Sequence, residues 1–260
     1  MDKYGLIGYP LGHSFSRKFF NEKFAREGIN AIYENYEIAD ARMLLQLVRE
    51  NPKLKGLNCT IPHKQAIMPL LDDIAEEARK IGAVNVIRIR HNKDGKPILK
   101  GFNSDAIGFT ESIKPLLSEK HRNALVLGTG GASKAICYAL TQLGIEWTYV
   151  SRSRRPGALT YEEVTPELMD TYQVIVNCSP VGMFPHTEEA PRLPYTALTP
   201  DHLLYDLVYN PEETLFMTLG AQQGATVKNG LEMLRLQALA SWEIWNESTE
   251  KSLQTEDEAI

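Results

Sequence analysis

A glycine-rich segment at residues 125–135, LVLGTGGASKA, limits the folds open to this chain more than any other part of its sequence. The apolar run that begins it is typical of a buried strand in a parallel sheet. Gly128 suits a tight turn, and Gly130 and Gly131 leave no side chain between the backbone and a ligand. Ala135 is small where a helix must lie close to the sheet. The pattern predicts a strand, a turn and a helix whose N-terminus accepts a pyrophosphate.

A basic cluster follows the next apolar run, where a dinucleotide-binding fold places the residue that meets the adenosine ribose. Residues 147–150 are expected to form a strand, and the chain then reads SRSRR at residues 151–155. A carboxylate at this position would accept the 2′-hydroxyl of NAD, whereas arginines favour the 2′-phosphate of NADP. A glycine-rich turn alone is a weak motif, and an arginine cluster alone is usually a solvated surface. Their spacing together predicts an NADP site with these contacts: Gly128, Thr129, Gly130, Gly131, Ala132, Ser151, Arg152 and Arg154.

Composition excludes several other classes of protein. Apolar residues make up 43% and charged residues 23% of the 260 positions, as in ordinary globular proteins, and the net charge of −5 argues against a nucleic-acid partner. The three cysteines are far apart and the six histidines are scattered, so we expect neither a disulfide framework nor a metal site. No run is long enough for a membrane span, and the first residues do not read as a signal peptide. We therefore expect a cytoplasmic protein with no membrane partner.

Apolar runs alternate with helical periodicity along the whole chain, which predicts an α/β fold. In the first block we expect strands at residues 4–8, 32–38, 56–60, 84–90 and 97–102, and helices at 14–27, 41–49, 64–71 and 73–81. Residues 92–95, NKDG, predict a hairpin between the last two strands. In the second block we expect strands at 124–127, 147–150, 174–178 and 203–206, and a helix at 133–143.

The phosphate-binding glycine pattern appears only in the second block, so the sequence predicts two domains. The first covers residues 1–105 and the second, of Rossmann type, covers residues 106–235. A long apolar helix after Gly230 is the last ordered element that we expect, and residues from about 236 to 260 are predicted to return to the first domain. Residues 252–260 are polar and acidic, and we expect them to fray.

Polar residues stand at strand ends and turns of the first block. Ser14 and Ser16 flank a helix start, although Ser14 alone fits an N-cap. Asn58 and Asn85 lie in apolar strands, and either one is as consistent with a satisfied core amide as with a ligand contact. Lys64 is predicted at the start of a short helix, where its charge opposes the helix dipole without a reason in folding. These positions are candidates for a substrate site.

These segments resemble the shikimate dehydrogenase family over nearly the whole chain. The resemblance is carried by GxPLxHSxS from Gly8, NxTxPxK at residues 58–64, GxNxD at 101–105, GxGGxxxA at 128–135, NxxPxGM at 177–183 and GLxMLxxQ at 230–237. It implies an N-terminal α/β substrate domain, a Rossmann-type NADP domain and the NADPH-dependent reduction of 3-dehydroshikimate to shikimate in aromatic biosynthesis. Cys59, Ile61, Ser104 and Ser151 depart from the usual family residues or fill variable positions.

The resemblance also implies a role for each matching residue. Ser14 and Ser16 would hold the substrate carboxylate, with Tyr209 as a further contact, and Lys64 with Asp105 would form the catalytic pair. The ring hydroxyls would be bound by Asn58, Thr60, Asn85 and Gln237. Cys178, Met183 and Gly230 would lie at the nicotinamide end of the cofactor. The substrate is expected in a cleft between the two domains.

Two other functions fit the same sequence. One is a quinate/shikimate dehydrogenase that accepts more substrates and cofactors, and the other is a binding protein that senses NADP without catalysis. Retention of both Lys64 and Asp105 favours an enzyme. The sequence is compatible with a monomer or a homodimer.

Overall fold

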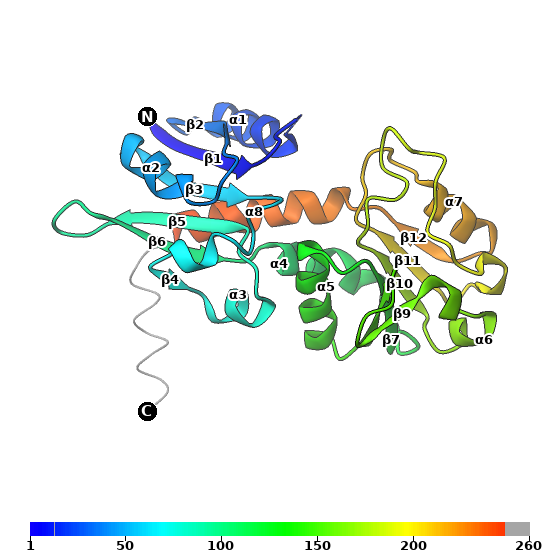
Figure 1. The fold of residues 1–260 in the computed structure, drawn as a ribbon. Coiled ribbons are helices and arrows are strands. Elements are labelled where there is room, and N and C mark those ends of the chain that lie inside the picture. Colours follow the sequence, from blue (N-terminus) through cyan, green and yellow to red (C-terminus); the bar gives the residue numbers. More distant parts are fainter. Residues whose placement is uncertain (13, 248–260) are drawn as a thin grey trace. The chain divides into compact units, whose positions relative to one another are not determined.

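The computed structural model describes residues 1–12 and 14–247, which form two compact α/β units (Figure 1). The first unit contains Met1–Ser104 and the chain from Ala238 onward, and the second contains Asp105–Gln237. The predicted frayed segment, residues 252–260, lies outside the described residues.

The first unit is built on a mixed sheet, six-stranded within the described chain, in the order β2-β1-β3-β5-β6-β4. Its strands are β1 (Asp2–Gly8), β2 (Ala31–Glu37), β3 (Leu54–Cys59), β4 (Asp73–Ile74), β5 (Val86–His91) and β6 (Pro97–Phe102). β1 pairs in parallel with β2 and β3, whereas β5 runs antiparallel to β3 and β6. The carboxyl ends of β1 and β3 therefore meet at one edge of the sheet, beside the start of β5.

Three helices of this unit lie in segments where the sequence predicted helices, and α1 has a cap at each end. They are α1 (Phe15–Glu27), α2 (Met43–Glu50), α3 (Glu76–Ile81), the 3-10 turn η1 (Met68–Leu70) and the later part of α8 (Leu231–Asn246). α1 begins where the Ser14 hydroxyl accepts a hydrogen bond from the Arg17 amide at 3.2 Å, and it ends at Gly28, whose φ of 65° favours glycine. The 92–95 hairpin turn is confirmed, with Gly95 at a φ of 77°.

The predicted helix at residues 64–71 is wrong. Only Met68–Leu70 forms a 3-10 turn, and residues 64–67 form non-helical turns. The backbone groups that a helix would use bond elsewhere, because the Lys64 carbonyl accepts from the Val84 amide at 2.8 Å. The buried His63 ring is also held, by a hydrogen bond from Nε2 to the Ile38 carbonyl at 2.6 Å. Lys64 thus does not begin a helix, and the argument from the helix dipole does not apply to it. The predicted helix at 73–81 likewise starts later, after β4.

The second unit is a parallel sheet, also six-stranded over the described residues, in the order β12-β11-β10-β7-β8-β9. Its strands are β7 (Asn123–Leu127), β8 (Glu146–Ser151), β9 (Ala158–Thr160), β10 (Val174–Asn177), β11 (Leu203–Asp206) and β12 (Thr226–Lys228). Every neighbouring pair is parallel. Numbered along the chain, this is the 3-2-1-4-5-6 order of the Rossmann fold, in which the order reverses between β7 and β10.

The helices of the second unit include three that the sequence pattern did not reveal. They are α4 (Asp105–Ile113), α5 (Gly131–Gln142), α6 (Pro166–Met169), α7 (Leu215–Gln222), the first turns of α8, and the 3-10 turns η2 (Lys114–Leu116), η3 (Tyr161–Glu163) and η4 (Tyr195–Ala197). α4, α6 and α7 were not predicted. α4 lies close to α8, because a Cβ on Gly108 would come within 2.6 Å of the Met233 carbonyl oxygen.

The C-terminal helix closes the core of the first unit, as predicted. Trp245 of α8 is 1% exposed and packs in an aromatic cluster with Tyr4, Phe20 and Tyr33. Its indole Nε1 donates to the Ile87 carbonyl at 3.1 Å. The second unit has its own core, which includes Leu125, Ile175 and Leu204 from β7, β10 and β11.

Candidate active site

Six of the predicted site residues belong to the first unit. They are Ser14, Ser16, Asn58, Thr60, Lys64 and Asn85. Backbone hydrogen bonds join the segments that carry them. The Thr60 amide donates to the Ile7 carbonyl at 2.9 Å, and the Cys59 amide donates to the Asn85 carbonyl at 2.8 Å. The bond between Lys64 and Val84 described above places Lys64 next to the segment that bears Asn85. These bonds bring four of the six residues, Asn58, Thr60, Lys64 and Asn85, to one edge of the sheet.

Ser14 fulfils the N-cap role that the sequence allowed, and it also borders a pocket. The pocket has a volume of about 410 Å³, and Arg17, Lys18 and Asn35 contribute to its lining. Glu22 also lines the pocket and lies 3.8 Å from Lys18, so its carboxylate offsets part of the positive charge of Arg17 and Lys18. As the N-cap, the Ser14 hydroxyl accepts a hydrogen bond and keeps its own hydrogen to donate, so this role is compatible with the predicted carboxylate contact.

The proposed catalytic pair is divided between the units. Lys64 lies in the first unit, and Asp105 is the first residue of the second. Asp105 is buried at the N-terminus of α4, where the helix dipole favours a negative charge. Tyr209, Gln237, Cys178, Met183 and Gly230 also belong to the second unit.

The predicted phosphate-binding turn lies where the strand order of the second unit reverses. Gly128 follows β7 at a φ of 103°, a conformation that favours glycine. A Cβ on Gly128 would lie 3.5 Å from the Cys178 carbonyl, and the Cys178 amide donates to the Leu127 carbonyl at 2.9 Å. Gly130 and Gly131 face open space where a side chain would be, at the start of α5. Ligands of doubly wound sheets bind at this switch point.

The arginine cluster is joined to the glycine turn by a direct contact. Ser151 is buried at the end of β8, and Arg155 Nη1 donates to Thr129 Oγ1 at 2.9 Å. Arg152 and Arg154 are exposed, and Arg154 lies 3.5 Å from Glu163. Arg155 was not among the predicted cofactor contacts, although it stands in the same basic run. Treating every arginine of residues 151–155 as a candidate phosphate contact would have included Arg155.

Asp206 is a buried carboxylate that braces the turn at residues 177–183. Its Oδ1 accepts from Asn177 Nδ2 and from the Val208 amide, both at 3.0 Å, and its Oδ2 accepts from Thr214 Oγ1 at 2.7 Å. Asn177 in turn accepts from the Ser179 amide at 3.0 Å. Burial raises the pKa of Asp206 to about 6, although the three hydrogen bonds act to lower it. Sequence reasoning treated Asp206 only as the end of a strand.

We expect Asp206→Asn to remove one component of the pH dependence of stability. Between about pH 4 and pH 6 the folded chain keeps the Asp206 proton that the unfolded chain has lost, so this residue makes stability fall as pH rises. The fall amounts to about 3 kcal/mol for a pKa raised from 3.8 to about 6. Urea unfolding at a series of pH values gives the free energy of unfolding of the wild type and of the variant. Subtracting one from the other removes the contribution of the other carboxylates, which both proteins share.

Asp94→Asn, in the exposed hairpin turn, is the control. Its free energy of unfolding should change with pH in parallel with that of the wild type. Parallel curves for Asp206→Asn as well would contradict the assignment of a raised pKa to Asp206.

No helix within residues 1–12 and 14–247 combines the length and the apolar character that crossing a bilayer requires.

Comparison with known proteins identifies the family. The model of the shikimate dehydrogenase substrate binding domain matches residues 6–87. The shikimate dehydrogenase (NADP(+)) of Caldanaerobacter subterraneus subsp. tengcongensis is 36% identical, over 93% of this chain and 90% of its own length. This chain belongs to the shikimate dehydrogenase family.

Solved structures of the shikimate dehydrogenase family agree with this fold. The enzyme from Aquifex aeolicus is 34% identical, with a TM-score of 0.82 over 95% of this chain and 93% of its own. The Thermus thermophilus enzyme, solved in complex with NADP(H) and shikimate, is 29% identical, with a TM-score of 0.81 over 95% of this chain and 94% of its own. The match to residues 6–87 contains all six site residues of the first unit.

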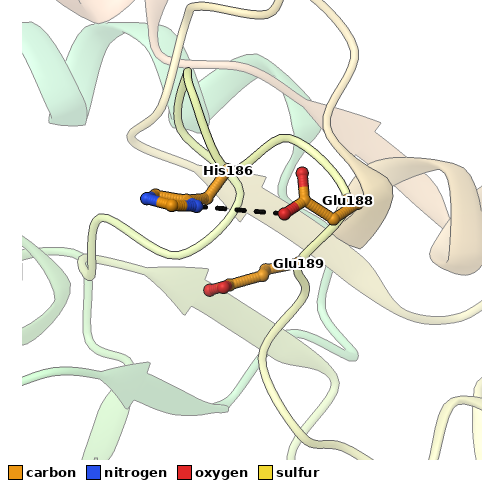
Figure 2. Close-up of side chains that lie close together, drawn as sticks. All are labelled: His186, Glu188 and Glu189. Atoms are coloured by element: carbon orange, nitrogen blue, oxygen red, sulfur yellow. Dashed lines mark ion pairs between the residues drawn. The ribbon is translucent and has the colours of Figure 1, made fainter.

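Among the described residues, three potential metal ligands lie close together in the second unit. Figure 2 shows His186, Glu188 and Glu189 on one loop of the second unit. Their ligand atoms lie within 4.8 Å of one another. All three residues are exposed, and His186 Nδ1 lies 3.8 Å from a Glu188 oxygen. Exposed acidic groups of this kind are common without an ion, so we assign no metal to them.

Proposed function

We propose that this chain is an NADP-dependent shikimate dehydrogenase, which reversibly reduces 3-dehydroshikimate to shikimate. The observation that carries the proposal is the set of polar residues at one sheet edge of the first unit, in a chain of this family. The Thermus thermophilus relative was solved with both NADP(H) and shikimate, which supports the same pair of ligands here.

The second unit fits NADP. Gly130 and Gly131 leave open space before α5, and the contact between Arg155 and Thr129 links the glycine turn to the basic run. Bound NADPH supplies the hydride. The pyrophosphate would be held by Gly128, Thr129, Gly130, Gly131 and Ala132, the 2′-phosphate by Ser151, Arg152, Arg154 and Arg155, and the nicotinamide end by Cys178, Met183 and Gly230.

The substrate residues bind, orient and exchange a proton. Ser14 and Ser16 would hold the carboxylate with Tyr209, and Asn58, Thr60, Asn85 and Gln237 would bind ring hydroxyls. Lys64 Nζ donates a proton to the substrate oxygen during reduction, and the neutral amine takes it back during oxidation. The ammonium also stabilises negative charge on that oxygen. Asp105 accepts a hydrogen bond from the neighbouring substrate hydroxyl.

A spectrophotometric assay tests the proposal. The purified chain is incubated with shikimate and NADP⁺, and the absorbance of the reduced nicotinamide is followed, with quinate and NAD⁺ in parallel reactions. Turnover with shikimate and NADP⁺ above the other combinations supports the proposal. Comparable turnover of quinate would favour the broader enzyme, and cofactor binding without turnover would favour an NADP-binding sensor.

We predict that Arg152→Ala weakens the binding of NADP⁺ without affecting the binding of NAD⁺. Hydrogen bonds to a charged group contribute about 1.5–3 kcal/mol, so the KM for NADP⁺ should rise roughly 10- to 150-fold. The KM for NAD⁺, which has no 2′-phosphate, should change little. Arg192→Ala removes an exposed arginine elsewhere in the second unit and serves as the control. An equal rise for both cofactors would remove Arg152 from the phosphate site.

We infer a cytoplasmic location and a monomeric or homodimeric state. Cys59, Cys137 and Cys178 all lie within the described residues and form no disulfide, which is consistent with a reducing compartment. Sedimentation of the purified chain distinguishes the two oligomeric states.

A further inference from the structure

A continuous series of buried polar side chains runs through the first unit and includes two of the proposed substrate residues. Tyr33 donates its hydroxyl hydrogen to Asn58 Oδ1 at 2.8 Å, and Asn58 Nδ2 donates to Ser241 Oγ at 2.9 Å. Ser241 Oγ lies 3.1 Å from Ser104 Oγ, which accepts from Asn85 Nδ2 at 3.1 Å. All five residues are buried. Burying so many polar groups is unfavourable unless they are paired, and here they pair with one another.

Backbone groups fix which way both amides point. The Asn85 carbonyl, which can only accept, lies 3.4 Å from Asn58 Nδ2. The Ser104 amide, which can only donate, lies 2.7 Å from Asn85 Oδ1. A flip of either side chain would set two acceptors or two donors against each other. The direction of hydrogen bonding through the series is therefore determined by the fold.

The fixed direction leaves Asn58 with one kind of hydrogen bond to offer a ligand. Its two amide hydrogens are directed at Ser241 and at the Asn85 carbonyl. Its Oδ1 accepts from Tyr33 and keeps a second lone pair. Toward a substrate, Asn58 therefore presents an acceptor, which suits a hydroxyl that donates.

The Tyr33 hydroxyl is fully buried. Burial raises the pKa of the Tyr33 phenol well above its usual value, and hydrogen bonding with Ser16 lowers it in part. The hydrogen bond from the Tyr33 hydroxyl to Asn58 is the contact that links this phenol to the proposed substrate residues.

We propose that Tyr33 and Ser241 are positioning residues, which hold the Asn58 amide so that it accepts a hydrogen bond from a substrate ring hydroxyl and rejects groups that cannot donate one. The inference rests on the proposed function, since it takes shikimate as the substrate. It adds to that function a reason for selectivity, because a site with a fixed acceptor discriminates against ligands that leave it unpaired.

Tyr33→Phe tests the proposal by removing one hydroxyl and keeping the ring, which stacks on Phe20 at a centroid distance of 4.8 Å. The KM for shikimate should rise about 10-fold or more, and the KM for NADP⁺ should stay unchanged. Ser241→Ala should act in the same direction. Tyr4→Phe is the matched control, because Tyr4 belongs to the same buried aromatic cluster but has no member of the series as a hydrogen-bond partner. Circular dichroism confirms folding of each variant.

Shikimate analogues that each lack one ring hydroxyl supply a readout that a structural role alone would not move. In the wild type, loss of the hydroxyl that Asn58 accepts should lower kcat/KM by about 10-fold or more. In Tyr33→Phe this penalty should shrink, while in Tyr4→Phe it should persist. If Tyr33→Phe behaves like Tyr4→Phe toward every analogue, the proposal is overturned although the wild type remains active. If the wild type itself does not oxidise shikimate, the proposed function fails first.

Discussion

Lys64→Ala is expected to lower kcat for shikimate oxidation by about 10²- to 10⁴-fold, the usual contribution of a general acid or base, with a much smaller change in the KM for shikimate. The lysine acts on a proton that moves in the transition state, so its loss affects that state more than substrate binding. The measurement is steady-state kinetics with shikimate and NADP⁺, with stopped-flow mixing to separate the chemical step from product release.

Two further variants separate proton transfer from charge. Lys64→Arg keeps a positive charge but cannot give up a proton at neutral pH, so its kcat should remain low. Recovery of most of the activity in Lys64→Arg would show that charge alone suffices. Lys93→Ala, in the exposed hairpin turn, is the control for removing a lysine from the first unit. A near-normal kcat in Lys64→Ala would exclude the lysine from the mechanism.

The βαβ unit formed by β7, α5 and β8 could be predicted because its signals are local. The apolar run before Gly128, the glycines and the basic run after β8 all act within one βαβ unit, and each occupies its expected place. The register of the hairpin around residues 92–95 is also local, since Asn92 Oδ1 accepts from the Lys96 amide at 2.8 Å. A pattern whose contacts lie within a few residues forms the same local structure whatever the rest of the fold is.

Contacts between distant segments could not be predicted in the same way. The helix expected at residues 64–71 failed because its backbone bonds to Val84. α4 was missed because its buried face mixes Asp105, Gly108 and Ser112 with apolar side chains, which weakens the apolar pattern of the helix. Asn58 and Ser241 are 183 positions apart, and only the fold makes them neighbours. The residues of the candidate site were predicted one by one from motifs, but the side chains that support them were not.

Trp245→Ala should lower the free energy of unfolding by about 3–5 kcal/mol, the range for removing a large buried aromatic side chain. Trp245 is almost fully buried in the first unit, and the variant would also leave the Ile87 carbonyl without its indole donor. Chemical unfolding followed by circular dichroism measures the loss. Glu243→Ala, an exposed position on the same helix, should change stability by no more than about 0.5 kcal/mol.

A substitution at Gly56 tests whether the Trp245 indole occupies the space next to this glycine. A Cβ on Gly56 would come within 2.3 Å of Trp245 Cδ1 and Nε1, so Gly56→Ala should destabilise the wild type by about 1–3 kcal/mol. In the Trp245→Ala background the same methyl enters the space that the indole has left, and its effect should approach zero. Gly12→Ala, whose Cβ meets nothing within 4 Å, should add the same small effect in both backgrounds. Additive losses for Gly56→Ala and Trp245→Ala would mean that the glycine is required for another reason, and that α8 is held to the first unit by contacts other than this one.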